Sequence, residues 1–229
     1  MRSFKHDIEA YNKKGIDIYA GSNPDDIAEE FDTIVLSPGV PYDLPFVQKA
    51  LANGTEVISE IELAYSLTPC PVCAVTGTNG KTTTTTLTGL LLETKYKNTA
   101  VVGNIGVAYS QKVKGLREND YVCAEISSFQ LEGTKTFRPH ISAVLNITPD
   151  HLNRHKTMEN YVAVKEMIFA NQTAEDFTIL NNNDEYCVKM ADKTRGRVFF
   201  FSSTKRLEEG IFLDGEHIHI VWNGMFFKH

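Results

Sequence analysis

Short apolar segments alternate with helical patterns along most of the chain. An apolar run bounded by Gly, Pro, Asn or Asp predicts a strand, and apolar residues three and four positions apart predict a helix. The predicted strands are residues 16–19, 33–37, 56–58, 72–76, 99–102, 121–127, 141–147, 177–180 and 198–201. The predicted helices are residues 7–14, a helix that starts at Asn23-Pro24, a helix from Pro45 to Asn53-Gly54, and residues 81–93, 158–171 and 184–193. This alternation is typical of βαβ units, so we expect an α/β fold with a mostly parallel sheet.

The pattern changes in the last part of the chain. Asp214-Gly215 and Asn223-Gly224 separate short alternating apolar runs between residues 210 and 227. Because these dipeptides favour tight hairpin turns, we expect a C-terminal antiparallel ribbon. His217 and His219 alternate with isoleucines, so we expect both rings on the solvent-exposed face of the ribbon rather than at a metal.

Composition excludes several classes of function. The 229 residues are 42% hydrophobic and 23% charged, which is the range of an ordinary globular protein. The net charge of −6 gives no electrostatic support for binding nucleic acid. No apolar run approaches the ~20 residues needed to cross a bilayer, and the N-terminus lacks a signal-peptide core. We therefore expect a cytoplasmic protein without membrane insertion.

Length and element order predict two domains. At about 150 residues per domain, the chain can hold one large domain or two small ones. Thr68-Pro69 closes the first group of elements, so we place the boundary between residues 1–68 and 69–229. A doubly wound domain normally begins with a strand and a glycine-rich turn, whereas this chain begins with a helical pattern. We expect the chain to be a piece of a larger protein.

Four cysteines raise the question of a redox or zinc site. Cys70 and Cys73 form a Cys-x-x-Cys pair, but no second pair completes a zinc set. Cys73 and Cys123 both fall in apolar strands, and Cys187 stands alone. We therefore expect small buried thiols and no disulfide.

The segment from Val75 to Thr83 has the layout of a phosphate-binding loop. An apolar strand enters a turn bounded by Gly77 and Gly80, and the turn opens a helix at Lys81-Thr82. Backbone N–H groups and the Lys81 ammonium can converge on phosphate oxygens, with a Thr82 hydroxyl for Mg²⁺. Val75 stands where the general motif has its first glycine, which favours a family with a shorter turn. The alternative is a strand-to-helix turn with no ligand.

Polar side chains follow three other predicted strands. Glu125 ends an otherwise apolar strand, Asn104 follows another, and Asp150-His151 comes after Pro149 and a third. The carboxyl ends of parallel strands meet at the edge where open α/β sheets bind ligands. A carboxylate there can hold Mg²⁺ directly or through water. The alternative for Glu125 is a surface acid at a strand end.

Lys165 lies in the apolar stripe of a predicted helix. Met158, Tyr161 and Ile168 belong to the same stripe. A lysine in that position must reach out of the core, find a partner, or lose its charge.

Five motifs, in this order, resemble those of the Mur ligases, and the resemblance runs through nearly the whole chain. The motifs are Gly77-Thr78-Asn79-Gly80-Lys81-Thr82-Thr83, Gly103-Asn104-Ile105-Gly106, Glu125-Ile126-Ser127-Ser128-Phe129-Gln130-Leu131-Glu132, Asn146-Ile147-Thr148-Pro149-Asp150-His151-Leu152 and Tyr161-Val162-Ala163-Val164-Lys165. Within the family, Phe129-Gln130 resembles the member that adds D-glutamate. The relative that adds meso-diaminopimelate or lysine usually has His after Ser-Ser.

The resemblance implies a fold and an activity. Residues 1–68 would form a partial Rossmann-like domain that binds a UDP-sugar, and residues 69–229 a partial, P-loop NTPase-like central domain that binds ATP. The implied activity is an ATP- and Mg²⁺-dependent amide ligase of peptidoglycan synthesis. It would add D-glutamate to UDP-N-acetylmuramoyl-L-alanine through an acyl phosphate.

The resemblance also assigns roles to residues of this chain. The phosphate-loop residues Gly77, Thr78, Asn79, Gly80, Lys81, Thr82 and Thr83 would bind the nucleotide, and the catalytic residues would be Lys81, Glu125, His151 and Lys165. Mg²⁺ would be held by Thr82, Glu125, His151 and Lys165, the last as a carbamate formed with CO₂. Substrate contacts would come from Ser37, Pro38, Gly39, Asn104 and His151.

The chain also departs from the family pattern. Asn153 stands where the family usually has Asp, which removes one charge near the metals. The first strand, the uridine-binding loop and the amino-acid-binding domain lie outside the sequence, so we expect the chain alone to fold without turning over. The alternatives are another Mur ligase, a folylpolyglutamate synthase relative, or a nucleotide-binding module that is not catalytic. Phe129-Gln130 argues against the first two, and ATP binding without an amide product would identify the third.

Overall fold

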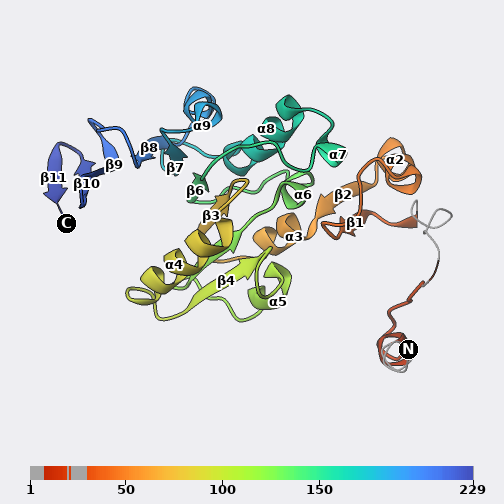
Figure 1. Cartoon of the computed structure of the whole chain (residues 1–229). Helices are drawn as coiled ribbons and strands as arrows, with labels where there is room; N and C mark the ends of the chain where they lie inside the picture. The colour runs from red at the N-terminus through yellow and green to blue at the C-terminus, as the bar shows by residue number, and fades with distance from the viewer. Residues whose placement is uncertain (1–7, 20, 22–29, 229) are drawn as a thin grey trace. The chain divides into compact units, whose positions relative to one another are not determined.

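The computed structural model describes residues 8–19, 21 and 30–228, and the chain groups into two compact units (Figure 1). One unit comprises residues 1–34 and 40–57, and the other comprises residues 35–39 and 58–229. The helix expected from Asn23-Pro24 lies outside the described residues. The expected domain boundary between residues 68 and 69 stays a prediction.

Residues 8–12 are helical, within the helix expected over residues 7–14, and a short two-stranded sheet with one helix follows. Strands β1 (Thr33–Leu36) and β2 (Glu56–Ser59) pair in a two-stranded sheet, and α2 (Pro45–Ala52) lies between them in the sequence. Pro45 occupies the start of α2, where its missing N–H costs no hydrogen bond. These three elements confirm the predictions. The strand expected at residues 16–19 is wrong, because Ile16 and Tyr19 are exposed and no described strand pairs with them.

A nine-stranded sheet organises the larger unit. Its strands are β3 (Val72–Thr76), β4 (Thr99–Gly103), β5 (Tyr121–Glu125), β6 (Ile141–Val144), β7 (Phe177–Asn181), β8 (Arg197–Ser202), β9 (Gly210–Asp214), β10 (His217–Trp222) and β11 (Met225–Lys228). Their order is β11-β10-β9-β8-β7-β6-β3-β5-β4. The pairs from β4 to β9 are parallel, and β9, β10 and β11 pair antiparallel. The expected α/β class, mostly parallel sheet and C-terminal ribbon are confirmed.

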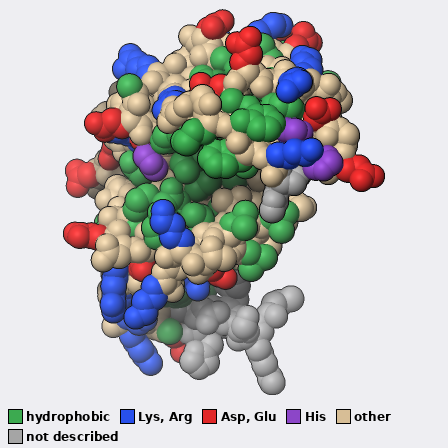
Figure 2. Space-filling view, turned by 90° about the vertical axis from the view of Figure 1, so that its left-hand side faces the viewer, with side chains coloured by type: hydrophobic (Ala, Val, Ile, Leu, Met, Phe, Trp, Pro, Cys, Tyr) green, Lys and Arg blue, Asp and Glu red, His purple; other side chains and the backbone are tan. Residues whose placement is uncertain are grey.

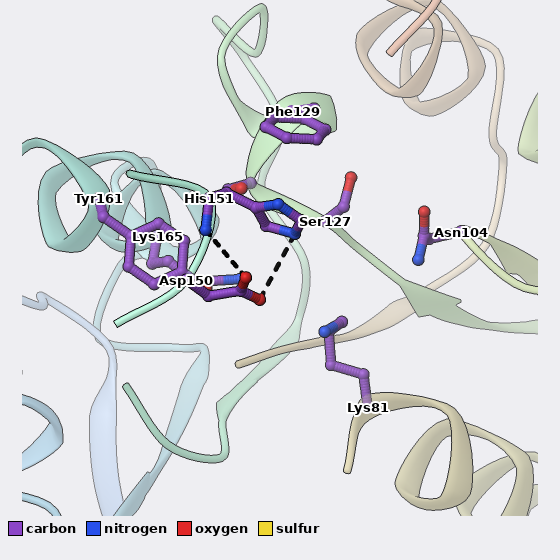
Figure 3. Close-up of a pocket in the computed structure, with 9 residues that line it drawn as sticks. Lys81, Asn104, Ser127, Phe129, Asp150, His151, Tyr161 and Lys165 are labelled. Carbon is purple, nitrogen blue, oxygen red and sulfur yellow. Dashed lines mark hydrogen bonds and ion pairs between the residues drawn. The ribbon is translucent and has the colours of Figure 1, made fainter. Parts of the chain in front are cut away.

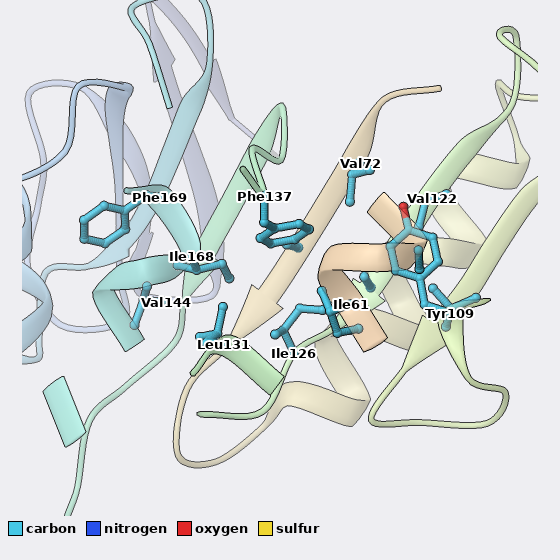
Figure 4. Close-up of a cluster of buried hydrophobic side chains, with 14 of the residues drawn as sticks. Ile61, Val72, Tyr109, Val122, Ile126, Leu131, Phe137, Val144, Ile168 and Phe169 are labelled. Atoms are coloured by element: carbon cyan, nitrogen blue, oxygen red, sulfur yellow. The ribbon is translucent and has the colours of Figure 1, made fainter. Parts of the chain in front are cut away.

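Helices bury the apolar residues of the central strands. The helices of this unit are α3 (Glu60–Ser66), α4 (Lys81–Glu93), α5 (Tyr109–Val113), α6 (Ser128–Leu131), α7 (Leu152–His155), α8 (Met158–Glu166) and α9 (Glu185–Met190). The main core joins α3, α5, α6 and α8 to the central strands, with Ile61, Ile126, Leu131 and Phe137 packed together (Figure 4). Helix α4 packs against β3, β4 and β5, and Leu92 joins a second cluster around Cys73 and Val75.

Some expected elements end earlier than predicted. Strand β5 ends at Glu125, because the Ser127 hydroxyl caps the short helix α6 by accepting from the backbone N–H of Gln130. Strand β6 ends at Val144, the last residue in register with β3. The long helix expected over residues 158–171 is α8 followed by a 3₁₀ turn, Met167–Phe169. The sequence did not predict α3, α5, α6 and α7, which are all short.

The ribbon corrects one expectation about its histidines. His217 is exposed as predicted, but His219 is buried, with 7% of its surface exposed. His219 lies opposite Phe212 in the strand register, so both rings project from one face and stack with centroids 5.1 Å apart. Ile218 is exposed instead. Within the described residues, no group of three or more His, Cys, Asp or Glu side chains could hold a metal.

Several apolar side chains of the ribbon remain exposed. Leu213, Ile218 and Met225 to Phe227 each expose between 44% and 53% of their surface. Figure 2 looks from the side on which the ribbon lies and shows hydrophobic side chains gathered around a hollow, with charged groups at its rim.

The cysteines are buried, free thiols, as expected. Burial raises the pKa of Cys70 to about 11 and that of Cys187 to about 12, so neither thiol ionises near neutral pH. Among the described helices, none has the length and apolarity that a membrane crossing requires.

Candidate functional site

The phosphate loop connects β3 to α4 in a conformation that depends on two glycines. Gly80 precedes the first residue of α4 with φ +82°, a left-handed conformation that a side chain disfavours. Gly77 has φ +146°, and a Cβ there would lie 3.1 Å from the Cβ of Leu145. The Lys81 ammonium donates to the carbonyl oxygens of Gly77 at 3.0 Å and Thr78 at 2.9 Å. Thr82 is exposed on the first turn of α4.

Glu125 is a buried acid with one unpaired oxygen. The carboxylate is 1% exposed, and its Oε1 accepts from the Asn104 side-chain amide at 2.8 Å. The Asn104 backbone N–H donates to the Glu125 carbonyl, also at 2.8 Å. A Cβ on Gly103 would lie 2.2 Å from that carbonyl oxygen, so the two strand ends meet there without room for a side chain. Among the residues that the structure describes, the buried Oε2 has no hydrogen-bond partner, which is costly unless a cation pairs with it. A carboxylate oxygen and the Thr82 hydroxyl are ligand types that suit Mg²⁺.

Asp150 and His151 form a second polar group at this edge. His151 has φ +51°, and its backbone N–H donates to Asp150 Oδ1 at 2.8 Å. The ring Nε2 lies 3.4 Å from Asp150 Oδ2. The His151 ring centroid is 4.9 Å from that of Phe129, which supports it from α6. The imidazole is half exposed and can therefore reach a ligand.

Lys165 is buried against the phosphate loop. Its ammonium donates to Thr76 Oγ1 at 3.1 Å and to the Gly77 carbonyl at 2.9 Å, and it lies 5.2 Å from the Tyr161 ring centroid. Only 2% of the residue is exposed. Burial, assisted by the nearby Lys81 charge and opposed by Asp150 and Glu125, lowers the pKa of Lys165 to about 7. Near neutral pH a substantial fraction of this amine is uncharged.

Lys81, His151 and Lys165, from three of these groups, meet with Asn104 around one pocket (Figure 3). The pocket has a volume of about 220 Å³ and is lined by Lys81, Asn104, Ser127, Ser128, Phe129, Asp150, His151, Tyr161 and Lys165. Of the expected site residues, Lys81, Asn104, His151 and Lys165 line it. Glu125 does not line the pocket but is hydrogen-bonded to Asn104, which does, and the other phosphate-loop residues, Thr82 included, do not line it. Ser37, Pro38 and Gly39 lie just after β1 and do not line this pocket.

Tyr161 is a pocket residue that the sequence did not predict as a site residue. Its hydroxyl lies 3.1 Å from Thr78 Oγ1, which links α8 to the phosphate loop. Its position one turn before Lys165 on the same stripe was the available signal.

His155 does not line the pocket but contacts Ser128 and Phe129, which do. Its Nε2 lies 2.9 Å from the Ser128 hydroxyl, and its ring stacks on Phe129 at 5.6 Å. Burial lowers the pKa of His155, which keeps the ring neutral and able to fix α6 in place. Asn153, the departure from the family pattern, is exposed on α7.

The depressed pKa of Lys165 predicts a pH-dependent stability. The ordinary lysine pKa is 10.5, so between about pH 7 and pH 10.5 the unfolded chain binds more protons at this residue than the folded chain. The free energy of unfolding should therefore rise with pH across this window, by at most about 1.4 kcal/mol per pH unit. Urea unfolding of the wild type and Lys165→Met at pH 7, 8, 9 and 10 measures the effect. A difference between the two proteins that stays constant with pH would contradict it.

Comparison with known proteins gives the family. The family model described as the Mur ligase middle domain matches residues 75–223. The chain is 49% identical over 202 residues to the UDP-N-acetylmuramoylalanine--D-glutamate ligase of Lachnoclostridium phytofermentans, covering 88% of this chain and 44% of that protein. It is 44% identical over 221 residues to the ligase of the same name from Clostridioides difficile, covering 96% and 48%. The chain thus spans about half the length of the curated relatives it matches.

Solved structures agree on the fold. The UDP-N-acetylmuramate:L-alanyl-gamma-D-glutamyl-meso-diaminopimelate ligase from Neisseria meningitides is 17% identical, with a TM-score of 0.56 over 95% of this chain and 73% of that one. A UDP-N-acetylmuramoyl-L-alanyl-D-glutamate--2,6-diaminopimelate ligase gives 0.55 at 20% identity, covering 93% and 55%. The middle-domain match spans well over half of the sequence and includes the phosphate loop, Glu125, His151 and Lys165. The chain therefore belongs to the Mur ligase family.

Proposed function

We propose that this chain forms the nucleotide-binding part of an ATP-dependent ligase that joins D-glutamate to UDP-N-acetylmuramoyl-L-alanine. One observation carries the proposal. Two lysines, a histidine and an amide converge on one pocket at the carboxyl ends of parallel strands, beside a buried carboxylate with an unpaired oxygen. Such a site suits a reaction that brings anions together, because cations must offset their repulsion. A cytoplasmic location, where ATP is available, goes with this proposal.

The relatives support the choice of amino acid. The curated proteins that match at 42% to 49% identity carry the name UDP-N-acetylmuramoylalanine--D-glutamate ligase. Phe129-Gln130 is the local feature that favours the D-glutamate-adding member, and Phe129 lines the pocket next to His151.

Each pocket residue then has a role. Lys81 and the amides at the start of α4 bind the nucleotide phosphates. Asn104 and His151 contact the acceptor carboxylate end of the UDP-sugar, with Ser37, Pro38 and Gly39 contributing to the UDP-sugar platform. Thr82 and Glu125 would hold one Mg²⁺ ion, and His151 together with Lys165 would hold a second. When bound, Mg²⁺ neutralises phosphate charge and orients the transferring group.

Lys165 is the residue that we expect to be modified by CO₂. Its amine is buried, its pKa is about 7, and it faces the loop rather than solvent. Addition of the neutral amine to CO₂ forms an N–C bond and releases one proton, giving a carbamate anion. The carbamate replaces the buried Lys165 ammonium by an anion, which can approach a divalent metal. Native mass spectrometry in bicarbonate should show a species heavier by one CO₂, lost in Lys165→Met.

The activity is tested at two levels. The 229-residue chain should bind MgADP in isothermal titration calorimetry. A longer protein containing this chain should release ADP only when UDP-N-acetylmuramoyl-L-alanine and D-glutamate are both present. ADP release with a different amino acid and not with D-glutamate would overturn the specificity.

A second candidate is a nucleotide-binding module that does not turn over. The phosphate loop with its Lys81 suits nucleotide binding whether or not a reaction follows. MgADP binding with no amide product, even in the longer protein, would identify it.

A further inference from the structure

Asn146 forms a clamp on Thr78 and Asn79, the two residues at the tip of the phosphate loop. Its Oδ1 accepts from the backbone N–H of Asn79 at 2.8 Å, and its Nδ2 donates to the carbonyl oxygen of Asn79 at 3.0 Å. Its own carbonyl oxygen accepts from the N–H of Thr78 at 2.9 Å. One residue from the loop after β6 therefore occupies both backbone groups of Asn79 and the N–H of Thr78.

The segment that carries Asn146 is itself anchored on both sides. The N–H of Leu145 donates to the Thr76 carbonyl at 3.0 Å, and the Leu145 carbonyl accepts from the Asn181 side chain at 2.9 Å. On the other side, the N–H of Ile147 donates to Asp184 at 2.7 Å. The amide of Asn146 is thus presented from a fixed backbone, and the loop tip takes its position from that backbone.

The phosphate loop packs closely against the backbone segment that carries Asn146. A Cβ on Gly77 would lie 3.1 Å from Leu145 Cβ and 3.3 Å from the backbone N of Asn146, so the glycine permits the approach that the clamp needs. Beyond the loop tip, Thr78 Oγ1 also accepts from the N–H of Thr148 at 3.0 Å. The loop after β6 therefore contacts the tip along its length.

The clamp decides which N–H groups are free for a ligand. Each residue has one backbone donor, and those of Thr78 and Asn79 are already used at short distances. The first bond inside α4 runs from Thr84 N–H to the Gly80 carbonyl at 3.0 Å. The N–H groups of Gly80, Lys81, Thr82 and Thr83 precede it and have no partner within the helix.

We propose that Asn146 is a positioning residue for nucleotide binding, and that phosphate oxygens are bound by the N–H groups of residues 80–83 while those of Thr78 and Asn79 stay with Asn146. The inference rests on the proposed function, since it assigns donors within that same site. Asn146 contacts the loop and not the phosphates, so its effect on affinity comes through loop geometry.

Titration of the ¹⁵N-labelled 229-residue chain with MgADP tests the donor assignment. Amide resonances of Gly80 to Thr83 should shift most, and the Asn79 amide should keep slow hydrogen exchange throughout. The largest shifts at Thr78 and Asn79, with loss of their protection, would overturn the assignment. This measurement needs no variant.

Asn146→Ala tests the clamp, and Asn171→Ala is the matched control. Asn171 also binds two backbone groups, the carbonyls of Lys135 and Phe137, and does not line the pocket. Asn146→Ala should speed exchange of the Asn79 amide and weaken MgADP binding about tenfold, whereas Asn171→Ala should change neither. Unchanged binding in Asn146→Ala, or equal losses in both variants, would refute the clamp.

Failure of the proposed function would look different. If the wild type did not bind MgADP at all, the nucleotide site would be refuted. Hydrogen exchange at Asn79 in Asn146→Ala would still decide whether Asn146 holds the loop.

Discussion

Lys81→Ala should reduce the affinity of the chain for MgADP by about 10- to 100-fold. Its ammonium already lies over the loop, 3.0 Å from the Gly77 carbonyl and 2.9 Å from that of Thr78, so little movement brings it to a phosphate. Hydrogen bonds to charged groups contribute about 1.5–3 kcal/mol each, which corresponds to this loss in affinity. Isothermal titration calorimetry on both proteins gives the ratio directly.

Lys189→Ala is the control for this prediction. Lys189 is an exposed lysine on α9 whose ion pair with Glu185 lies on the surface. Its removal lowers the net charge equally but should leave the dissociation constant unchanged. Equal losses in the two variants would mean that the total charge of the chain, and not the loop, governs binding.

Glu62→Ala should destabilise the fold by about 3 kcal/mol or more. The carboxylate of Glu62 in α3 is 4% exposed and accepts several hydrogen bonds from one loop. The donors are the backbone N–H groups of Lys135, Thr136 and Phe137 and the hydroxyl of Thr136. Removing the acceptor takes the partner from the buried N–H of Phe137, which costs about 1–3 kcal/mol, and also removes the part-buried hydrogen bonds from Lys135 and Thr136. Urea unfolding followed by circular dichroism measures the change.

Two further variants separate the causes. Glu62→Gln keeps one acceptor oxygen and should lose less stability than Glu62→Ala. Glu175→Ala removes a carboxylate that is 87% exposed, and it should change the free energy of unfolding by less than about 0.5 kcal/mol. If Glu62→Ala behaved like Glu175→Ala, the loop at residues 135–137 would not depend on this carboxylate.

The sequence predicts the part of the site that local patterns encode. The strand, turn and helix from Val72 to Glu93 appear with the expected bounds, because the apolar run, Gly80 and Lys81-Thr82 each specify local geometry. Lys165 was identifiable because a charge in an apolar stripe contradicts its surroundings. Asn104 and His151 followed from their places after strands, since parallel strands bring such residues to one edge.

The rest depends on contacts between distant segments. The alternation of His and Ile along β10 does not say which side of the strand is buried. His219 is buried because it stacks on Phe212 of the neighbouring strand. The clamp by Asn146 joins residues 67 positions apart. In the sequence Tyr161 is an apolar-stripe residue like its neighbours, and only the folded structure brings its hydroxyl to Thr78 Oγ1. Short helices such as α6 carry too few residues for a periodic pattern.

The contact among Gly103, Asn104 and Glu125 limits which single substitutions this corner of the chain accepts. Because Asn104 binds the carbonyl and the carboxylate of Glu125, and Gly103 leaves no space beside that carbonyl, a substitution at one of the three positions disturbs the other two. Libraries that randomise them one at a time will recover almost only damaged proteins.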